Sequence, residues 1–349
     1  MTEPIRLLIV DDSPFMRRAI SSLVTGEEDI KVVGTAKDGE DAVRQIQDLK
    51  PDIATMDIEM PVMDGLTALK IIMEKFPIPV IMLSSLTEEG AKETLDALDL
   101  GAADYIPKNL SNVSLNILKV KGDLLSKIRA IAAKKYFFRP RGNEHTEEYL
   151  KTNKNKNNKI DIVAIGSSTG GPKALQDVIP RLPQNFPVPI ILVQHMPKAF
   201  TGSFAARLSS ISHIKVIEAA GGEIIKPGTA YLSPGDKHLS VVKEKREDFV
   251  TLLSNEPEDT INRPSISVMM ESVAKGYPGK ALGVILTGMG SDGLLGMKKI
   301  KETGGRTIAQ DEETCVVYGM PKAVVDAGIA DKVLPIYKIG DEIIKETVC

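Results

Sequence analysis

The chain has 349 residues, which at about 100–200 residues per domain suggests two domains or three. Hydrophobic residues make up 42% and charged residues 26%, so the chain can bury a core and is not disordered as a whole. A net charge of -3 argues against a nucleic-acid-binding protein, and two cysteines exclude a disulfide framework or a Cys-rich zinc site. The sequence opens on no signal peptide and has no apolar run near the ~20 residues of a membrane span, so we expect a cytoplasmic protein without membrane insertion.

Strand-like and helix-like segments alternate in the first third of the chain. An apolar run over Ile5–Val10 predicts a strand, and Ser13 followed by Pro14 predicts the start of a helix. Further expected strands are Ile53–Met56, Val80–Leu83 and Tyr105–Ile106, and further expected helices are Thr67–Phe76 and Glu88–Leu100. This alternation indicates βαβ units and a parallel sheet, in which functional side chains gather where the strands end.

Polar side chains stand at these strand ends. Asp11 and Asp12 follow the first expected strand and Asp57 the second, while Ser84 and Lys108 follow the next two. Three carboxylates close together repel each other unless a cation lies among them, and Mg²⁺ suits such oxygen ligands. A hydroxyl and an ammonium beside that ion are suited to phosphoryl oxygens. The alternative, that each Asp only caps a loop, explains single residues but not all of them together.

The segments IVDDSPFMRR, ATMDIEMPVMDG, VIMLSS and GAADYIPK resemble the receiver domain of two-component response regulators, over about Ile5 to Leu125. The resemblance implies a flavodoxin-like fold with five parallel strands and phosphorylation by a histidine kinase. It assigns the phosphoacceptor as Asp57, the Mg²⁺ ligands as Asp11, Asp12, Asp57 and the backbone carbonyl of Glu59, the switch residues as Ser84 and Tyr105, and the phosphoryl ion-pair partner as Lys108. The family usually has Pro after this lysine; here Asn109 takes its place, which leaves the geometry of that loop open.

A polar stretch separates this part from the rest of the chain. Lys151–Lys159 reads KTNKNKNNK without an apolar period, which is typical of a linker. Aromatic residues at 136–138 are bunched rather than interleaved with the basic ones, which favours a solvated tether over a nucleic-acid patch. We therefore expect a receiver domain over residues 1–125, a linker over 126–158 and a second domain over 159–349.

The second part opens with a strand, a glycine-rich turn and a helix. Ile160–Ile165 is a β-branched run, and Gly166-Ser167-Ser168-Thr169-Gly170-Gly171 follows it before a helix that starts at Pro172. This G-x-S-x-G pattern between a strand and a helix exposes the central Ser168 as a nucleophile. The glycine patterns that bind phosphate do not match, because Pro172 and Lys173 follow the last glycine. A turn without a catalytic role stays the alternative.

A serine nucleophile needs a base, and the chain has four histidines. His195 is the candidate, because it directly follows the apolar strand Ile190–Gln194. His145 lies in the linker, His213 has no motif around it, and His238 is expected in an exposed hairpin turn. A histidine that only caps a strand is the alternative.

Asp292 is the candidate carboxylate that orients the base, since it stands in a glycine-rich loop after the strand Ala281–Leu286. Free N–H groups of that loop are suited to an oxyanion. Three polar groups at three strand ends predict a Ser–His–Asp triad, whose chain order differs from that of the α/β-hydrolases and favours a different doubly wound sheet. Arg263-Pro264-Ser265 predicts a helix start, for which a structural role is favoured and a contribution at the cleft is the alternative.

Six long segments of this half are similar to the catalytic domain of chemotaxis protein-glutamate methylesterases of the CheB type, over nearly all of Lys159 to Val348. They are AIGSSTGGPKAL, VQHMPKAFTGSFAARL, PGTAYLSPGDKHLSV, NRPSISVMMESVA, LTGMGSDGLLGM and AQDEETCVVYGMPKAVVDAG. The resemblance implies a doubly wound, mainly parallel α/β hydrolase domain that releases methanol from methylated glutamates of chemoreceptors and deamidates receptor glutamines, without a metal. It implies these roles: catalytic Ser168, His195 and Asp292; an oxyanion donor in the Met289 N–H; and Thr169 fixing the elbow.

A receiver in front of this domain is the arrangement found in that family, so the resemblance implies activation by phosphorylation. We hypothesise that the unphosphorylated receiver covers the cleft near Ser168, and that a phosphoryl group on Asp57 favours an open form through Ser84 and Tyr105. Two other interpretations stay open. One is a response regulator that binds nucleic acid, which the pI near 6.0 disfavours; the other is a hydrolase acting on a protein outside chemotaxis.

Overall fold

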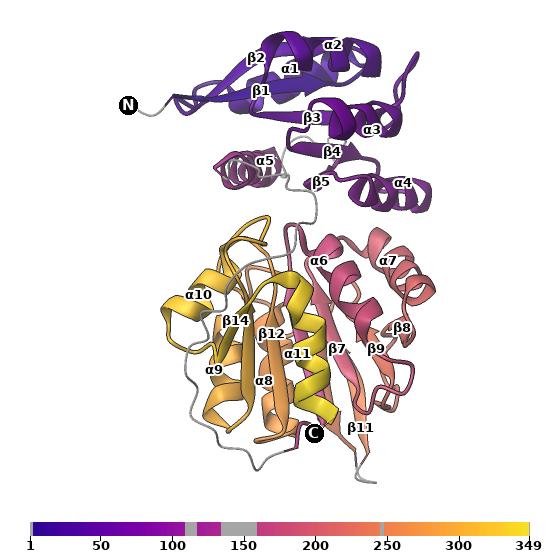
Figure 1. The fold of residues 1–349 in the computed structure, drawn as a ribbon, viewed down its shortest axis with the longest axis vertical. Helices are drawn as coiled ribbons and strands as arrows, with labels where there is room; N and C mark the ends of the chain where they lie inside the picture. Colours follow the sequence, from indigo (N-terminus) through magenta and orange to yellow (C-terminus); the bar gives the residue numbers. More distant parts are fainter. Residues whose placement is uncertain (1–2, 109–116, 134–158, 245–247, 349) are drawn as a thin grey trace. The chain divides into compact units, whose positions relative to one another are not determined.

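The computed structural model describes residues 3–108, 117–133, 159–244 and 248–348, with only the backbone at 117–120. It divides the chain into two compact units, residues 1–144 and 145–349, each of which we describe by itself (Figure 1). The domain limits drawn at residues 125 and 158 stay predictions, and most of the expected linker, residues 134–158, lies outside the described residues. Of the helices described, none has both the length and the apolar character needed to cross a membrane.

The N-terminal unit is a five-stranded sheet with helices between its strands. The strand order is β2-β1-β3-β4-β5, and every neighbouring pair is parallel. The elements are β1 (Ile5–Val10), α1 (Pro14–Val24), β2 (Ile30–Ala36), α2 (Gly39–Leu49), β3 (Ile53–Asp57), α3 (Gly65–Lys75), β4 (Val80–Ser84), α4 (Glu88–Asp99), β5 (Asp104–Pro107) and α5 (Ile117–Ala132). The strand order reverses at β1, so the loops after β1 and β3 open onto one crevice. The predicted five-stranded parallel receiver fold is confirmed.

Side-chain caps explain where four helices of this unit begin. Ser13, Asp38, Asp64 and Thr87 each accept a hydrogen bond from the backbone N–H three residues further on. Ser13 precedes Pro14 at the first helical position, as the sequence predicts. These caps place the helix starts directly after the strand ends, where the polar site residues stand.

Three elements of this unit, β2, α2 and α5, are not among the strands and helices expected from the sequence pattern. The sequence pattern does not predict β2, because Lys31, Gly34 and Thr35 interrupt its apolar residues and only its two ends are fully buried. Helix α5 continues to Ala132, past residue 125, where we expected the receiver domain to end. The helix extends because its apolar face stays buried beyond that point, at Ile128 and Ile131.

The C-terminal unit is a seven-stranded parallel sheet with helices on both faces. The strand order is β14-β13-β12-β6-β7-β9-β8, and β10 and β11 form a separate antiparallel pair. The strands are β6 (Ile162–Ser167), β7 (Ile190–Gln194), β8 (Lys215–Glu218), β9 (Thr229–Leu232), β10 (His238–Lys243), β11 (Phe249–Ser254), β12 (Ala281–Ile285), β13 (Arg306–Gln310) and β14 (Lys332–Leu334). The helices are α6 (Gly171–Val178), the short 3-10 helix Ile179–Arg181, α7 (Lys198–Ile211), α8 (Ile266–Gly276), α9 (Leu294–Glu302), α10 (Met320–Asp326) and α11 (Ile336–Val348). Helix α6 packs against α11, and α8 packs against α9 on the other face (Figure 1). The predicted doubly wound, mainly parallel sheet is confirmed.

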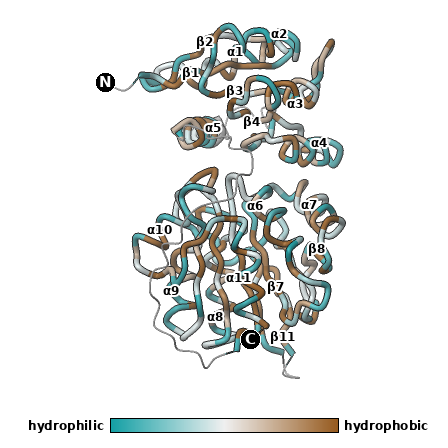
Figure 2. The backbone as a smooth tube through the Cα atoms, viewed as in Figure 1, coloured by the Kyte–Doolittle hydropathy of each residue, from teal (hydrophilic) through white to brown (hydrophobic). Residues whose placement is uncertain are grey.

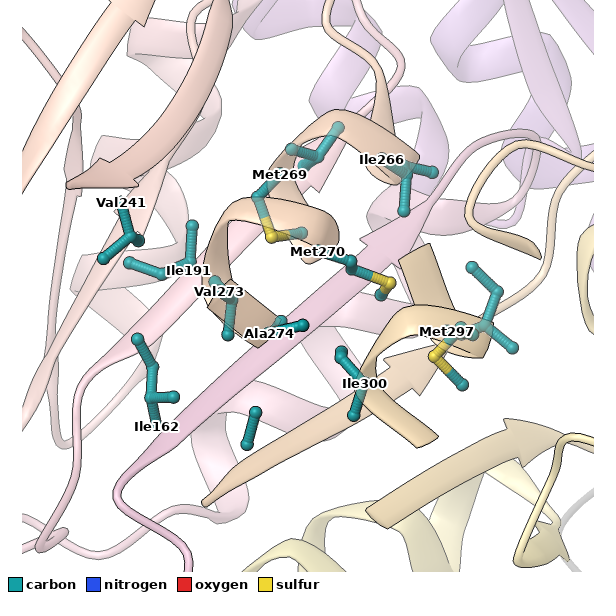
Figure 3. Close-up of a cluster of buried hydrophobic side chains, with 14 of the residues drawn as sticks. Ile162, Ile191, Val241, Ile266, Met269, Met270, Val273, Ala274, Met297 and Ile300 are labelled. Atoms are coloured by element: carbon teal, nitrogen blue, oxygen red, sulfur yellow. The ribbon is translucent and has the colours of Figure 1, made fainter. Parts of the chain in front are cut away.

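Helix α8 lies in the main core of this unit, between the sheet and β10. Its residues Met269, Met270 and Val273 are fully buried in one cluster with Ile191 of β7 and Val241 of β10 (Figure 3). The strands of the sheet are mostly hydrophobic along their length in Figure 2, as expected where helices cover both faces. This packing fixes the direction of α8 and therefore the place of its N-terminus.

The N-terminus of α8 comes unusually close to the end of β6. A Cβ atom on Gly166 would lie 2.3 Å from Cγ2 of Ile266, which is the first residue of α8 and fully buried. Gly166 therefore allows an approach between helix and strand that any larger residue blocks.

We expect Gly166→Ala to destabilise the C-terminal unit by about 1–3 kcal/mol, the usual cost of adding a carbon to a packed core. Gly202→Ala is the matched control, because Gly202 is an exposed position inside α7 where a new Cβ has room, and alanine there should stabilise the helix by about 1 kcal/mol. Urea unfolding followed by circular dichroism measures both. A Gly166→Ala variant as stable as the wild type would contradict this account of how α8 docks.

Candidate active site and phosphoacceptor site

The turn between β6 and α6 presents Ser168. Its N–H donates to the carbonyl oxygen of Thr287 at 3.0 Å, which ties the turn to the loop after β12. Gly170 has a φ of 74°, in the left-handed region that favours glycine, and the N–H of Gly171 donates back to the Ser168 carbonyl at 2.7 Å. The backbone therefore turns sharply after Ser168 and leaves its side chain half-exposed.

The structure brings Ser168, His195 and Asp292 together from the ends of three neighbouring strands, β6, β7 and β12. Nδ1 of His195 lies 3.2 Å from Oγ of Ser168, and Nε2 lies 2.9 Å from Oδ2 of Asp292. A carboxylate only accepts hydrogen bonds, so Nε2 carries the proton of the neutral ring and Nδ1 is left to accept from the serine hydroxyl. The arrangement is suited to removing a proton from Ser168.

Helix α8 directs its N-terminus at Asp292. The carboxylate accepts hydrogen bonds from the N–H groups of Ile266 at 2.8 Å and Ser267 at 3.0 Å, and from the hydroxyl of Ser265 at 3.1 Å. Burial raises the pKa of Asp292, but the hydrogen bonds from His195 and from these backbone N–H groups outweigh it and hold the pKa well below its usual range. Asp292 is therefore ionised at neutral pH.

Two backbone N–H groups near Ser168 are available to a reacting oxygen. In the described part of the chain, neither the Thr169 N–H nor the Met289 N–H donates a hydrogen bond to another group. The Met289 loop packs directly on the nucleophile, since a Cβ on Gly288 would lie 2.8 Å from Cβ of Ser168. Such free N–H groups beside a nucleophile can stabilise the negative oxygen of a tetrahedral intermediate.

Three acidic residues of the N-terminal unit lie together in the crevice at the ends of β1 and β3. Asp11, Asp12 and Asp57 each offer a carboxylate oxygen, and these oxygens lie within 4.8 Å of one another. Lys108 lies 2.5 Å from Oδ2 of Asp57 and 3.3 Å from Oδ2 of Asp11. Burial raises the pKa of Asp57 to about 6 although the Lys108 ammonium opposes the shift. Carboxylates this close together repel each other, and a cation between them would relieve the repulsion. Their oxygens are the ligands that Mg²⁺ prefers, so these residues fit a Mg²⁺ ion.

The expected switch residues of this unit are both buried. The Ser84 hydroxyl hydrogen-bonds the carbonyl oxygen of Gly90 at 3.2 Å and accepts from the Thr94 hydroxyl at 2.5 Å, which ties β4 to α4. The Tyr105 ring packs inside, with the ammonium of Lys127 5.4 Å from its centre. Glu59 is exposed and donates its N–H to Asp57 at 3.4 Å, while Asn109 lies outside the described residues.

Comparisons with known proteins agree with this geometry. A family model described as CheB methylesterase matches residues 163–343, and one described as response regulator receiver domain matches residues 7–117. A protein-glutamate methylesterase/protein-glutamine glutaminase of Thermotoga maritima is 48% identical over 98% of both chains. One of Nitratidesulfovibrio vulgaris is 47% identical over 95% of this chain and 96% of the relative. The chain belongs to the CheB methylesterase family.

A solved structure supports the same assignment for the C-terminal unit. The crystal structure of the Thermotoga maritima CheB methylesterase catalytic domain matches with a TM-score of 0.52 and 48% identity, covering 54% of this chain and 98% of that one. The methylesterase domain and the receiver domain predicted from the sequence are therefore both confirmed.

One residue that sequence analysis did not single out, Gln194, connects the backbone of Ser168 with that of His195. Gln194, buried at the end of β7, donates from Nε2 to the carbonyl oxygens of Ser168 at 2.9 Å and His195 at 3.0 Å. Its Oε1 accepts from the Ser167 hydroxyl at 2.7 Å, so the partners fix the orientation of the amide. A polar residue that closes an apolar strand directly before the base is the signal that could have found it.

Two other residues lie behind Asp292. Ser265, for which a structural role at a helix start was favoured over a contribution at the cleft, caps α8 and hydrogen-bonds the carboxylate. The expectation that His238 lies in an exposed turn is wrong: it is the first residue of β10 and fully buried. It is buried because β10 packs against α8, which the short segment PGDKHL does not reveal.

We expect the stability that Asp292 contributes to depend on pH in a defined direction. A carboxyl with a pKa lowered by folding stabilises the protein above its unfolded pKa, near 3.8, and this contribution is lost as pH falls below that value. The difference in unfolding free energy between wild type and Asp292→Asn should therefore shrink from pH 5 to pH 3. Urea unfolding of the C-terminal unit measures this, and a difference that stays constant over that range would count against a lowered pKa.

Proposed function

We propose that this chain hydrolyses the methyl esters of glutamate side chains on chemoreceptors and deamidates receptor glutamines, with Ser168 as the nucleophile. The observation that carries the proposal is the pair of contacts made by one imidazole, 3.2 Å to the Ser168 hydroxyl and 2.9 Å to the Asp292 carboxylate. The names of the relatives as protein-glutamate methylesterases and protein-glutamine glutaminases support the choice of ester and amide.

The first half of the reaction acylates Ser168. As Oγ attacks the side-chain carbonyl carbon of the substrate, Nδ1 of His195 takes the hydroxyl proton, and the positive ring is stabilised by Asp292. The carbonyl oxygen becomes negative, and the N–H groups of Thr169 and Met289 are the proposed donors to it. His195 then passes the proton to the departing group, so that methanol leaves from an ester and ammonia from an amide.

The second half restores the enzyme. His195 removes a proton from water, whose oxygen attacks the glutamyl ester on Ser168. The same N–H groups stabilise the second tetrahedral intermediate. The proton on His195 returns to Oγ as the bond to Ser168 breaks, and the product is a glutamate side chain. We keep the prediction that this site acts without a metal, because Ser168 and His195 carry out each proton transfer and Asp292 stabilises the positive ring.

Ser168→Ala should lower the rate of methanol release from methylated receptor by at least ~10³-fold, because no other group replaces the nucleophile. Ser167→Ala is the matched control: the Ser167 hydroxyl bonds Gln194 and not the base, so this variant should stay within about tenfold of the wild type. Gas chromatography of released methanol measures both. Comparable rates for the Ser168→Ala variant and the wild type would remove the proposed function.

We further propose that a chemotaxis histidine kinase phosphorylates Asp57 and thereby activates the hydrolase, in the cytoplasm. Asp11, Asp12, Asp57 and the backbone carbonyl of Glu59 would hold Mg²⁺, which supplies positive charge against the phosphoryl oxygens. Nζ of Lys108 lies 2.5 Å from Oδ2 of Asp57, so it is placed to form an ion pair with a phosphoryl group on that residue. Its approach from β5 supports this role, and the roles of Ser84 and Tyr105 as switch residues follow from the same proposal.

Acetyl phosphate with Mg²⁺ should raise the rate of methanol release by the wild type, and Asp57→Asn should abolish that rise while keeping the basal rate. Phosphorylation creates the charge that biases the receiver, and asparagine cannot form the acyl phosphate. The assay compares initial rates with and without the phosphodonor. Equal wild-type rates under both conditions would contradict regulation by the receiver.

A further inference from the structure

His238 is a buried histidine that the reaction itself does not use. It opens β10, and its side chain is fully buried. Nδ1 accepts a hydrogen bond from the N–H of Ser265 at 3.1 Å, and Nε2 lies 3.2 Å from the hydroxyl of Thr260. A buried polar ring with two partners is held in one orientation.

These contacts fix the protonation of the ring. The Ser265 N–H can only donate, so Nδ1 must be unprotonated and Nε2 must carry the proton. Nε2 then donates to Thr260, whose hydroxyl donates in turn to the carbonyl oxygen of Pro257 at 3.4 Å. Burial lowers the pKa of His238 and the nearby Arg263 lowers it further, although the Pro257 backbone and Asp292 oppose the shift. The ring is therefore neutral and acts as an acceptor toward Ser265.

Ser265 connects this ring to the catalytic carboxylate. Its N–H points to His238, while its hydroxyl donates to Oδ1 of Asp292 at 3.1 Å and accepts from the N–H of Val268 at 3.4 Å. One residue thus caps α8, holds Asp292 and is itself held by β10. A shift of Ser265 would change the direction from which Asp292 meets the imidazole of His195.

Strand β10, which carries His238, is itself held against α8. The N–H of Val241, further along the strand, donates to the hydroxyl of Ser272 on α8 at 2.9 Å. Leu239 and Val241 are both buried in the core cluster that contains Met269 of α8. Because β10 is attached to α8 at two separated points, His238 holds the N-terminal residue of the helix against a fixed neighbour.

We propose that His238 is a positioning residue for the hydrolysis: by accepting from the Ser265 N–H it fixes Asp292, and so keeps Nδ1 of His195 directed at Ser168. This inference rests on the proposed function, because it concerns the same triad. It assigns a role to the histidine of the PGDKHL segment, which contacts neither the nucleophile nor the base.

Two amide substitutions distinguish this role from a merely structural one. His238→Asn places an amide oxygen near the position of Nδ1, so it keeps an acceptor for the Ser265 N–H. His238→Gln places its amide near the position of Nε2 and leaves that N–H without an acceptor. Methanol release should then show a kcat within about threefold of the wild type for Asn and about tenfold lower for Gln, with KM unchanged in both. Thr260→Val, which removes the partner of Nε2, should cause a smaller fall of the same kind and serves if the Gln variant does not fold.

The decisive comparison repeats these substitutions in an Asp292→Ala background. A residue that acts through Asp292 has no further effect on kcat once that carboxylate is gone, whereas a structural effect lowers kcat by the same factor in both backgrounds. Equal factors in the two backgrounds, or equal kcat values for Asn and Gln, would overturn the proposal. Activity retained by Ser168→Ala would instead overturn the proposed function, so the two failures are distinguishable.

Discussion

Asp292 stays ionised inside the C-terminal unit because helix α8 points its first N–H groups at the carboxylate. Removing a charge from water is costly unless hydrogen bonds replace the lost hydration. Here three backbone N–H groups, those of Ile266, Ser267 and Gly293, do so together with a serine hydroxyl and the imidazole of His195. The direction of α8 follows from its packing between the sheet and β10. The chemistry proposed for Ser168 thus depends on the buried Met and Val side chains that pack around α8.

Both units use the same architectural rule for different chemistry. In each, a parallel sheet brings polar residues from separate strands to one edge, and helices after the strands supply caps and N–H groups there. In the N-terminal unit this edge concentrates carboxylates, whose mutual repulsion and burial favour a bound cation. In the C-terminal unit the residues are a hydroxyl, an imidazole and a single carboxylate, which together move protons.

The sequence predicts those parts of each site that follow from local order along the chain. Asp57 and His195 stand at or directly after the ends of apolar strands, Asp292 stands in a glycine-rich loop that follows one, and Ser168 has glycines on both sides in a recognisable turn. Local order does not predict contacts between elements that are distant in sequence. Gln194 looks like the end of a strand, and His238 looks like part of a polar turn, until tertiary packing shows what each side chain bonds. Strand β2 and the end of α5 escape sequence analysis for a related reason. Strand β2 is only partly buried, so its apolar pattern is weak, and the end of α5 is set by packing against the rest of its unit.

The central claim is that the imidazole of His195 carries its proton on Nε2, toward Asp292, and keeps Nδ1 unprotonated toward Ser168. Nitrogen-15 NMR of the histidine side chains at neutral pH tests it most directly, with His195→Gln to assign the signals. The account predicts a protonated Nε2 shift and an unprotonated Nδ1 shift for His195. The reverse pattern, with the proton on Nδ1, would contradict it.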